Sequence, residues 1–141
     1  MSPLERLLPF VLQHPLHRAM GVTTIDAQDG KAQLEIEVGG DAVNAAGVFH
    51  GGIAYCLADM VCYAALLSVL DDGENAVTHD IHVSMLRGAR RGDRIRFEGR
   101  VLKRGRNVAF MESQAWCGDH LIARATVTKS VIRMADAPTP G

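Results

Sequence analysis

An acidic residue, Asp59, lies near the middle of the segment from Ile53 to Leu70, in which nearly every other position is apolar or small. Moving a carboxylate out of water is costly unless a partner or a bound proton offsets the lost hydration. An acid in such a segment therefore needs a reason, and Asp59 is the first candidate for a chemically active residue.

A second candidate lies just before this segment, in the sequence His50-Gly51-Gly52. If a helix begins near His50, the amide N–H groups of its first turn have no acceptor within the helix and lie at the positive end of its dipole. The two glycines would let a carbonyl oxygen approach these donors, because no Cβ is in the way. The alternative is that Gly51 and Gly52 only permit close packing of the helix on a sheet.

The segment that carries both candidates, Gly51 to Leu70, is long enough to be a membrane span, since a helix of about 20 residues is ~30 Å long. A span is disfavoured because flanking Lys, Arg and aromatic anchors are missing and Asp59 lies at the centre. A helix that is apolar on all sides outside a membrane must be buried on all sides. We expect a sheet to wrap around this helix, and a second copy of the chain to cover what the sheet leaves open.

The rest of the chain supplies a short helix and the strands. An amphipathic helix is predicted from Leu4 to Leu12, followed by a hairpin whose turn is Gln28-Asp29-Gly30. After the acidic turn "DDGEN", apolar residues recur with period two, and the Gly-containing links suit hairpin turns. The apolar positions of the last predicted strand are Leu121, Ala123, Ala125, Val127 and Val131. The sequence thus predicts one α+β domain over residues 1–134, with an antiparallel sheet of about six strands around one long central helix, and a flexible tail over residues 135–141.

The residues around both candidates resemble a known family, the hotdog-fold acyl-CoA thioesterases of the phenylacetate-pathway (PaaI-like) type. The shared pattern is N-x-x-G-x-x-HGG-x-x-x-x-L-x-D, present here as Asn44, Gly47, His50-Gly51-Gly52, Leu57 and Asp59. The resemblance extends from about Met20 to Met134. It implies a hotdog fold and the hydrolysis of an acyl-CoA to a free acid and coenzyme A, with no metal and no redox cofactor.

The resemblance also assigns roles to individual residues. The Gly51 N–H would polarise the thioester carbonyl as an oxyanion donor, and Asp59 would act as general base toward water or as nucleophile. Asn44 would orient the substrate or the water, unless it is only an Asx-turn residue. His50 could protonate the leaving thiolate, but a thiolate is already a good leaving group, so we favour hydrogen bonds that fix the loop.

Related enzymes also hold the attacking water with a Ser or Thr on the strand after the acidic turn, where this chain has Thr78. Because that turn varies in length among such proteins, His79 and Asp80 are the alternatives at this position.

The spacing of Gly51 and Asp59 predicts a site shared between two subunits. Eight residues of helix separate them by ~12 Å, too far for one chain to bring both groups to one carbonyl carbon. A homodimer with two-fold symmetry places Asp59 of one chain against Gly51 of the other, and an exposed sheet face suggests a dimer of dimers. The polar group that keeps Asp59 ionised is then expected from across the interface, with Asn44 and Thr78 as the first candidates.

Positive charge is concentrated between Arg87 and Arg106, where nine basic residues against two acids give +7, so that the remainder carries −8 in a chain of net charge −1. The Gly-containing turns "RGARRGD" and "KRGR" are expected to converge on the phosphates of coenzyme A. The candidate residues are Arg90, Arg91, Arg104 and Arg106. A nucleic-acid-binding module is the weakest alternative, because Phe97 is the single aromatic residue in this stretch.

Other function classes remain as alternatives. A non-catalytic acyl-CoA sensor on the same fold typically lacks the helix acid, and a hotdog hydratase resembles a different motif that this sequence does not contain. The three cysteines form no CxxC pair, and the N-terminus has no features of a secretory signal, so we expect a reducing, cytoplasmic location. No ligand spacing supports a zinc site.

Overall fold

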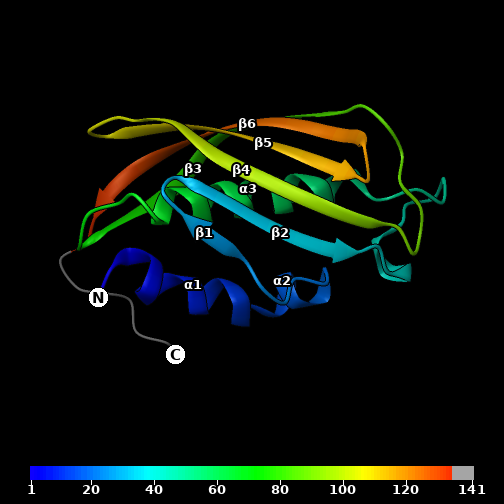
Figure 1. Ribbon diagram of the computed structural model, residues 1–141, viewed down its shortest axis with the longest axis horizontal. Coiled ribbons are helices and arrows are strands. Elements are labelled where there is room, and N and C mark those ends of the chain that lie inside the picture. Colours follow the sequence, from blue (N-terminus) through cyan, green and yellow to red (C-terminus); the bar gives the residue numbers. More distant parts are fainter. Residues whose placement is uncertain (135–141) are drawn as a thin grey trace.

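A six-stranded antiparallel sheet wraps around one long helix in the computed structural model, which describes residues 1–134 (Figure 1). The predicted tail, 135–141, lies outside the described residues. The helices are α1 (Pro3–Gln13), α2 (Pro15–Ala19) and α3 (Gly51–Leu67), with a 3-10 turn, η1, at Gly40–Ala42. The strands are β1 (Asp26–Gln28), β2 (Lys31–Glu37), β3 (Glu74–Met85), β4 (Arg94–Arg104), β5 (Val108–Cys117) and β6 (His120–Arg133). This arrangement confirms the predicted hotdog fold.

The central helix, α3, ends earlier than predicted, at Leu67 rather than Leu70. The hydroxyl of Ser68 donates to the Ala65 carbonyl (2.6 Å) and accepts from the Gly30 N–H (2.8 Å), which stops the helix and ties it to the first hairpin. No helix in residues 1–134 is both long and apolar enough to cross a membrane.

One side of α3 is left uncovered by the sheet. Residues facing the sheet, such as Leu57 and Val61, are fully buried, whereas Tyr55 is 45% exposed. The residues of this open side follow helical spacing and are Gly52, Tyr55, Cys56 and Asp59. The sheet thus covers the helix incompletely, as expected, and Asp59 lies on the uncovered side.

On the covered side, α3 lies very close to the sheet at Gly99 of β4. A Cβ at this position would lie 3.0 Å from the backbone carbonyl carbon and oxygen of Val61. Backbone atoms cannot rotate aside, so glycine is the residue that allows this spacing between helix and sheet.

The N-terminal third of the chain mostly follows the sequence prediction. The β1–β2 turn has positive φ at Asp29 (53°) and Gly30 (78°), as a two-residue type I′ hairpin requires. Helix α1 is slightly longer than predicted and begins with a capping box between Ser2 and Glu5. Helix α2 was not predicted; Pro15 occupies its first turn, and His14 caps it by accepting from the Leu16 N–H.

Strand β3 is an edge strand and contains a bulge. Its pairing with β6 shifts between Thr78 and Asp80, so that His79 is an extra residue. Before the bulge Thr78 pairs with Lys129, and after it Ile81 pairs with Val127. Residues three apart on a regular strand face opposite sides, but the extra residue turns Thr78 and Ile81 to the same side, toward α3.

Candidate active site

Asp59 forms a cluster with one residue from each of two neighbouring strands. The Thr78 hydroxyl of β3 donates to Asp59 Oδ1 (2.6 Å), and the ammonium group of Lys129 on β6 donates to the same oxygen (2.8 Å). Lys129 Nζ also donates to Thr78 Oγ1. The second carboxylate oxygen of Asp59, Oδ2, has no hydrogen-bond partner within residues 1–134. The carboxylate is therefore held at one oxygen and open at the other.

Burial within this cluster is uneven. The Lys129 side chain is 2% exposed, whereas the Asp59 side chain is 37% exposed. The Lys129 ammonium thus lies on the core side of the carboxylate. Solvent can reach the Asp59 side chain, which carries the free oxygen Oδ2.

The partner of Asp59 differs from the expected one. We predicted a polar group from across a subunit interface, but the ion pair and the hydrogen bond both come from the same chain. Of the two residues proposed as partners, Thr78 contacts Asp59 within the same chain, and a contact with Asn44 of a second chain stays a prediction. Thr78, rather than His79 or Asp80, is the residue of β3 that reaches the acid, because the bulge begins only after Thr78.

Lys129 was missed by the sequence analysis, although a signal was present. The apolar positions of the last strand recur at every second residue from 121 to 131, and only position 129 breaks the series. A lysine at an inward-facing position of a strand needs an anion nearby, and Asp59 was already expected to need a polar partner. Considering the two anomalies together would have predicted the pair.

The start of α3 has the donor geometry expected for an oxyanion site. The His50 ring caps the helix, with Nδ1 accepting from the Gly52 N–H (2.9 Å), and the His50 carbonyl accepts from Ile53 and Ala54. This leaves the Gly51 N–H without an acceptor among the described residues. The capping hydrogen bond agrees with the structural role that we favoured for His50.

Asn44 organises the loop before the helix. Its side-chain oxygen, Oδ1, accepts from the N–H groups of Ala46 (2.9 Å) and Val48 (3.2 Å), which is an Asx-type arrangement. The Asn44 side-chain amide nitrogen keeps its two donors for another partner. Within one chain the side chain therefore shapes the loop that leads to Gly51.

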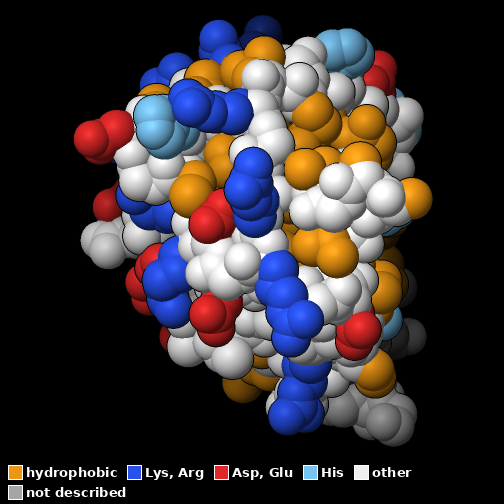
Figure 2. Space-filling view, turned by 90° about the vertical axis from the view of Figure 1, so that its right-hand side faces the viewer, with side chains coloured by type: hydrophobic (Ala, Val, Ile, Leu, Met, Phe, Trp, Pro, Cys, Tyr) orange, Lys and Arg blue, Asp and Glu red, His pale blue; other side chains and the backbone are white. Residues whose placement is uncertain are grey.

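An apolar surface adjoins both ends of this site. Tyr55, Ile81 and Met85 are 45%, 38% and 37% exposed, and a Cβ at Gly51 would lie 3.8 Å from the Tyr55 ring and 3.9 Å from Met85 Cγ. Figure 2 shows the end of the molecule that carries the β3–β4 connection, where hydrophobic side chains are exposed beside a column of Lys and Arg side chains.

The thiols near Asp59 are neutral at neutral pH. Burial raises the pKa of Cys62 to about 12, and burial followed by the Asp59 charge raises the pKa of Cys56. Neither cysteine is therefore an activated nucleophile.

The four arginines proposed for phosphate binding form two separate groups. Arg90 and Arg91 lie in the β3–β4 connection, and Arg104 and Arg106 lie at the far end of β4. Since β4 has 11 residues, the groups are ~30 Å apart, so they do not converge within one chain as expected. The physical reason is that the connections before and after β4 lie at opposite ends of that strand. The β3–β4 connection is also not the predicted hairpin turn, because β3 pairs with β6 and not with β4.

The two groups also differ in their neighbours. The β3–β4 connection contacts the loop before α3, where the Phe49 N–H donates to the Ala89 carbonyl (2.7 Å). This brings Arg90 and Arg91 to the Gly51 end of the helix. Arg104, in contrast, forms an ion pair with the fully buried Glu74.

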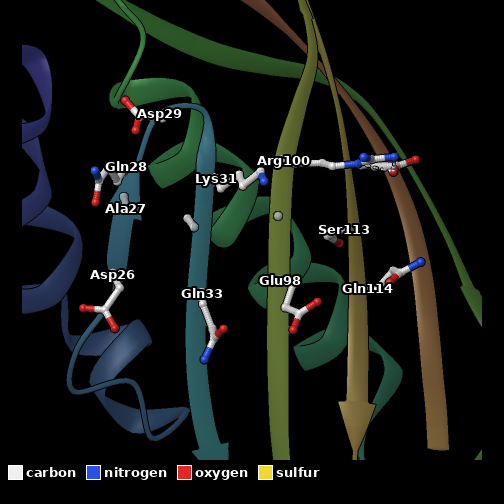
Figure 3. Close-up of a pocket in the computed structure, with 13 residues that line it drawn as sticks. Asp26, Ala27, Gln28, Asp29, Lys31, Gln33, Glu98, Arg100, Ser113 and Gln114 are labelled. Carbon is white, nitrogen blue, oxygen red and sulfur yellow. Dashed lines mark hydrogen bonds and ion pairs between the residues drawn. The ribbon is translucent and has the colours of Figure 1, made fainter. Parts of the chain in front are cut away.

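A broad hollow elsewhere on the surface has none of these features. It lies over β1, β2, β4 and β5, and Figure 3 shows it from the side of the sheet opposite α3, with the helix behind the strands. Its lining is a mixture of both charge signs, including Lys31, Arg100 and Glu98. We therefore place the candidate active site at Asp59 and not in this hollow.

The chain is similar in sequence and structure to known thioesterases. Residues 46–123 match the model of the thioesterase superfamily. Acyl-coenzyme A thioesterase 13 of Homo sapiens is 33% identical over 94 residues, which span 66% of this chain and 66% of that protein. The phenylacetic acid degradation-related protein of Ralstonia eutropha JMP134 is 26% identical with a TM-score of 0.79, covering 92% of this chain and 99% of that one. A conserved protein of Pseudomonas aeruginosa is 25% identical with a TM-score of 0.81, covering 86% and 96%.

Proposed function

This chain belongs to the thioesterase superfamily, as its sequence pattern predicted, and from that premise we propose that it hydrolyses an acyl-coenzyme A to a free acid and coenzyme A. The observation that carries the proposal is Asp59, a carboxylate fixed at Oδ1 by Thr78 and Lys129 and open at Oδ2. The name of the human relative, an acyl-coenzyme A thioesterase, supports the substrate class.

In the proposed reaction Asp59 acts as a general base. Oδ2 takes a proton from water, the water oxygen attacks the thioester carbon, and the Gly51 N–H stabilises the oxyanion that forms. The C–S bond then breaks, and the thiolate of coenzyme A leaves and takes up the proton that Asp59 accepted. Attack by Asp59 itself on the thioester carbon is the alternative, in which an acylated carboxyl group forms and water then hydrolyses it.

We propose that the site is completed by a second copy of the chain. Within one chain Gly51 and Asp59 are ~12 Å apart along α3, and the open side of the helix is uncovered. The edge strand β3 exposes apolar side chains beside that open side, among them Ile81 (38% exposed) and Met85 (37% exposed). A two-fold homodimer would bury these side chains and place Asp59 of one subunit against Gly51 of the other.

The coenzyme A moiety is proposed to extend from Gly51 toward the β3–β4 connection. Arg90 and Arg91 lie at this end of α3 and could pair with its phosphates. Arg104 is engaged by Glu74, so among the four candidates it has the least freedom to bind a phosphate. The three cysteines are free thiols, which fits the proposed cytoplasmic location.

The proposal is tested by measuring free thiol released from a panel of aromatic, short-chain and medium-chain acyl-CoAs. We expect wild-type protein to hydrolyse at least one of them, and Asp59→Asn to lower kcat by about 100-fold or more, since an amide cannot accept the proton. Asp119→Asn, at an exposed acid in the β5–β6 turn, is the matched control and should leave kcat unchanged. A wild-type chain that binds acyl-CoA without releasing thiol would instead be a non-catalytic binding protein.

A further inference from the structure

Lys129 occupies a core position that apolar packing does not explain. It lies on the inward face of β6, pairs with Thr78 on one side and Ala109 on the other, and is 2% exposed. An ammonium group at such a position is tolerated only with an anion beside it. The anion is Asp59, on a different layer of the fold.

The ammonium group is held from three directions. Nζ donates to Asp59 Oδ1 (2.8 Å) and to Thr78 Oγ1, and it lies 5.2 Å from the centroid of the Tyr63 ring, where a cation is stabilised by the π electrons. Two of the three N–H donors of the ammonium group thus have acceptors, and the group also lies near an aromatic ring.

A buried ion pair elsewhere in the chain shows what a purely structural arrangement looks like. Glu74 is 0% exposed, with Oε1 bonded to Arg104 and to the Asp71 N–H and Oε2 3.3 Å from Arg133. Oε2 is buried, has no hydrogen-bond partner within residues 1–134, and faces the guanidinium of Arg133 in an ion pair. Asp59 likewise receives two donors at one oxygen and no hydrogen bond at the other within residues 1–134, but its side chain is 37% exposed, so that water can reach the carboxylate.

The hydroxyl of Thr78 completes the geometry. It gives its hydrogen to Asp59 and accepts one from Lys129, so one acceptor site remains. A water molecule that donates one hydrogen to Asp59 Oδ2 and the other to Thr78 Oγ1 keeps a lone pair for attack. The orientation of Thr78, and with it the orientation of the water, depends on Lys129.

This inference rests on the proposed function and deepens it. We propose that Lys129 is a positioning residue whose ammonium group pairs with Asp59 at Oδ1 and engages Thr78, so that Oδ2 is the oxygen that acts on water. Lys129 itself does not touch the substrate.

The other titratable groups around the pair do not take over this task. Burial raises the pKa of Cys56, Cys62 and Tyr63 on α3, so all three are neutral at neutral pH. Glu112 on β5 is engaged by Arg100 (2.5 Å). Lys129 is the described residue that forms an ion pair with Asp59.

The test is Lys129→Met, which removes the charge and keeps a long unbranched side chain. We expect kcat to fall about 100-fold with KM changed by less than about threefold, and the acidic limb of the pH–rate profile to move to higher pH, because the carboxylate loses its cation. In an Asp59→Asn background the same change should lower kcat by less than about threefold, since both residues act as one unit. Lys31→Met, at an exposed lysine of β2, is the matched control and should change neither kcat nor the profile.

Thermal unfolding shows whether each variant is folded. If Lys129→Met does not fold, Lys129→Gln keeps a donor to Oδ1 without the charge and should shift the acidic limb in the same direction. The proposal is overturned if a folded Lys129 variant keeps the wild-type kcat and pH profile while Asp59→Asn is inactive. A wild-type chain that hydrolyses no acyl-CoA would instead refute the proposed function itself.

Discussion

At the scale of single residues, substitutions of Thr78 can separate the effect of side-chain shape from the effect of hydrogen bonding. Thr78→Val keeps the branched shape but removes the hydroxyl that donates to Asp59 and accepts from Lys129. We expect kcat to fall roughly 10- to 100-fold and the free energy of unfolding to fall by about 1–3 kcal/mol, because a buried donor of Lys129 loses an acceptor. The measurements are thiol release and denaturant unfolding.

Thr78→Ser is the matched control, since it keeps the hydroxyl and loses only a methyl group. It should retain kcat within about threefold. Equal losses in the Val and Ser variants would mean that the methyl packing of Thr78, and not its hydroxyl, supports the site.

At this scale the sequence predicted two of the three residues of the cluster. Asp59 was found because an acid interrupts an apolar segment, and Thr78 because the resemblance to related enzymes implied a Ser or Thr on the strand after the acidic turn. Lys129 is 70 residues from Asp59 along the chain, and no local pattern carries a contact over that separation. Only the unusual position of a lysine among inward-facing residues pointed to it.

Among the elements, the buried carboxylate of Glu74 connects three strands and a helix. It lies on β3 and pairs with Arg104 of β4 and Arg133 of β6, while Arg6 of α1 donates to its backbone carbonyl (3.1 Å). Burial alone would raise the pKa of the Glu74 carboxyl, but the hydrogen bonds from Arg104 and the Asp71 N–H and the two guanidinium charges hold this pKa below its usual value. The ion pairs of Glu74 thus hold β3, β4 and β6 together at this end of the sheet.

We expect Glu74→Gln to lower the free energy of unfolding by about 2 kcal/mol at pH 7, because the arginines lose their anion. A carboxyl with a lowered pKa in the folded state stabilises the fold above its unfolded pKa of about 4.3, and this stabilisation is lost as pH falls through the folded pKa. The difference between wild type and variant should therefore shrink between pH 6 and about pH 3. Denaturant unfolding at several pH values measures it.

Glu98→Gln removes the acid of an exposed pair with Arg96 and serves as the comparison. It should change stability by less than about 0.5 kcal/mol at any of these pH values. A Glu74→Gln difference that stays constant down to pH 3 would contradict the assignment of the charge to Glu74.

The sequence predicted the elements better than their irregularities. Helical and alternating periodicities located α1, α3 and the β1–β2 hairpin, since each buries one face and so carries a repeating pattern. The bulge at His79 has no such mark, because one extra residue leaves the composition of a strand unchanged. Helix α2 was missed since five residues are too few to show a period.

For the molecule as a whole, the shared site predicts complementation between two inactive chains. A heterodimer of one Asp59→Asn chain and one chain with Gly51→Pro, which lacks the N–H donor, contains one complete site. We expect about half of the wild-type activity per dimer in verified heterodimers, and about 1% or less in either homodimer. Differently tagged chains, co-expressed and purified over both tags, supply the heterodimer.

Two observations would contradict the shared site. One is a verified heterodimer with no recovered activity while both chains are folded. The other is full activity in a chain that sediments as a monomer at the assay concentration.

The close approach of α3 to β4 at Gly99 affects how accurately the residues of the active site are positioned. The hydrogen bonds of Asp59 join the helix layer to the sheet layer, so their lengths depend on the distance between the two layers. This distance depends on the contact between the Val61 backbone and Gly99, which has no side chain. Val61 lies two positions along the helix from Asp59. A methyl group at Gly99 would push the helix and the sheet apart by a few tenths of an ångström. The hydrogen bonds between the two layers would then lengthen, although Gly99 itself touches none of the reacting groups.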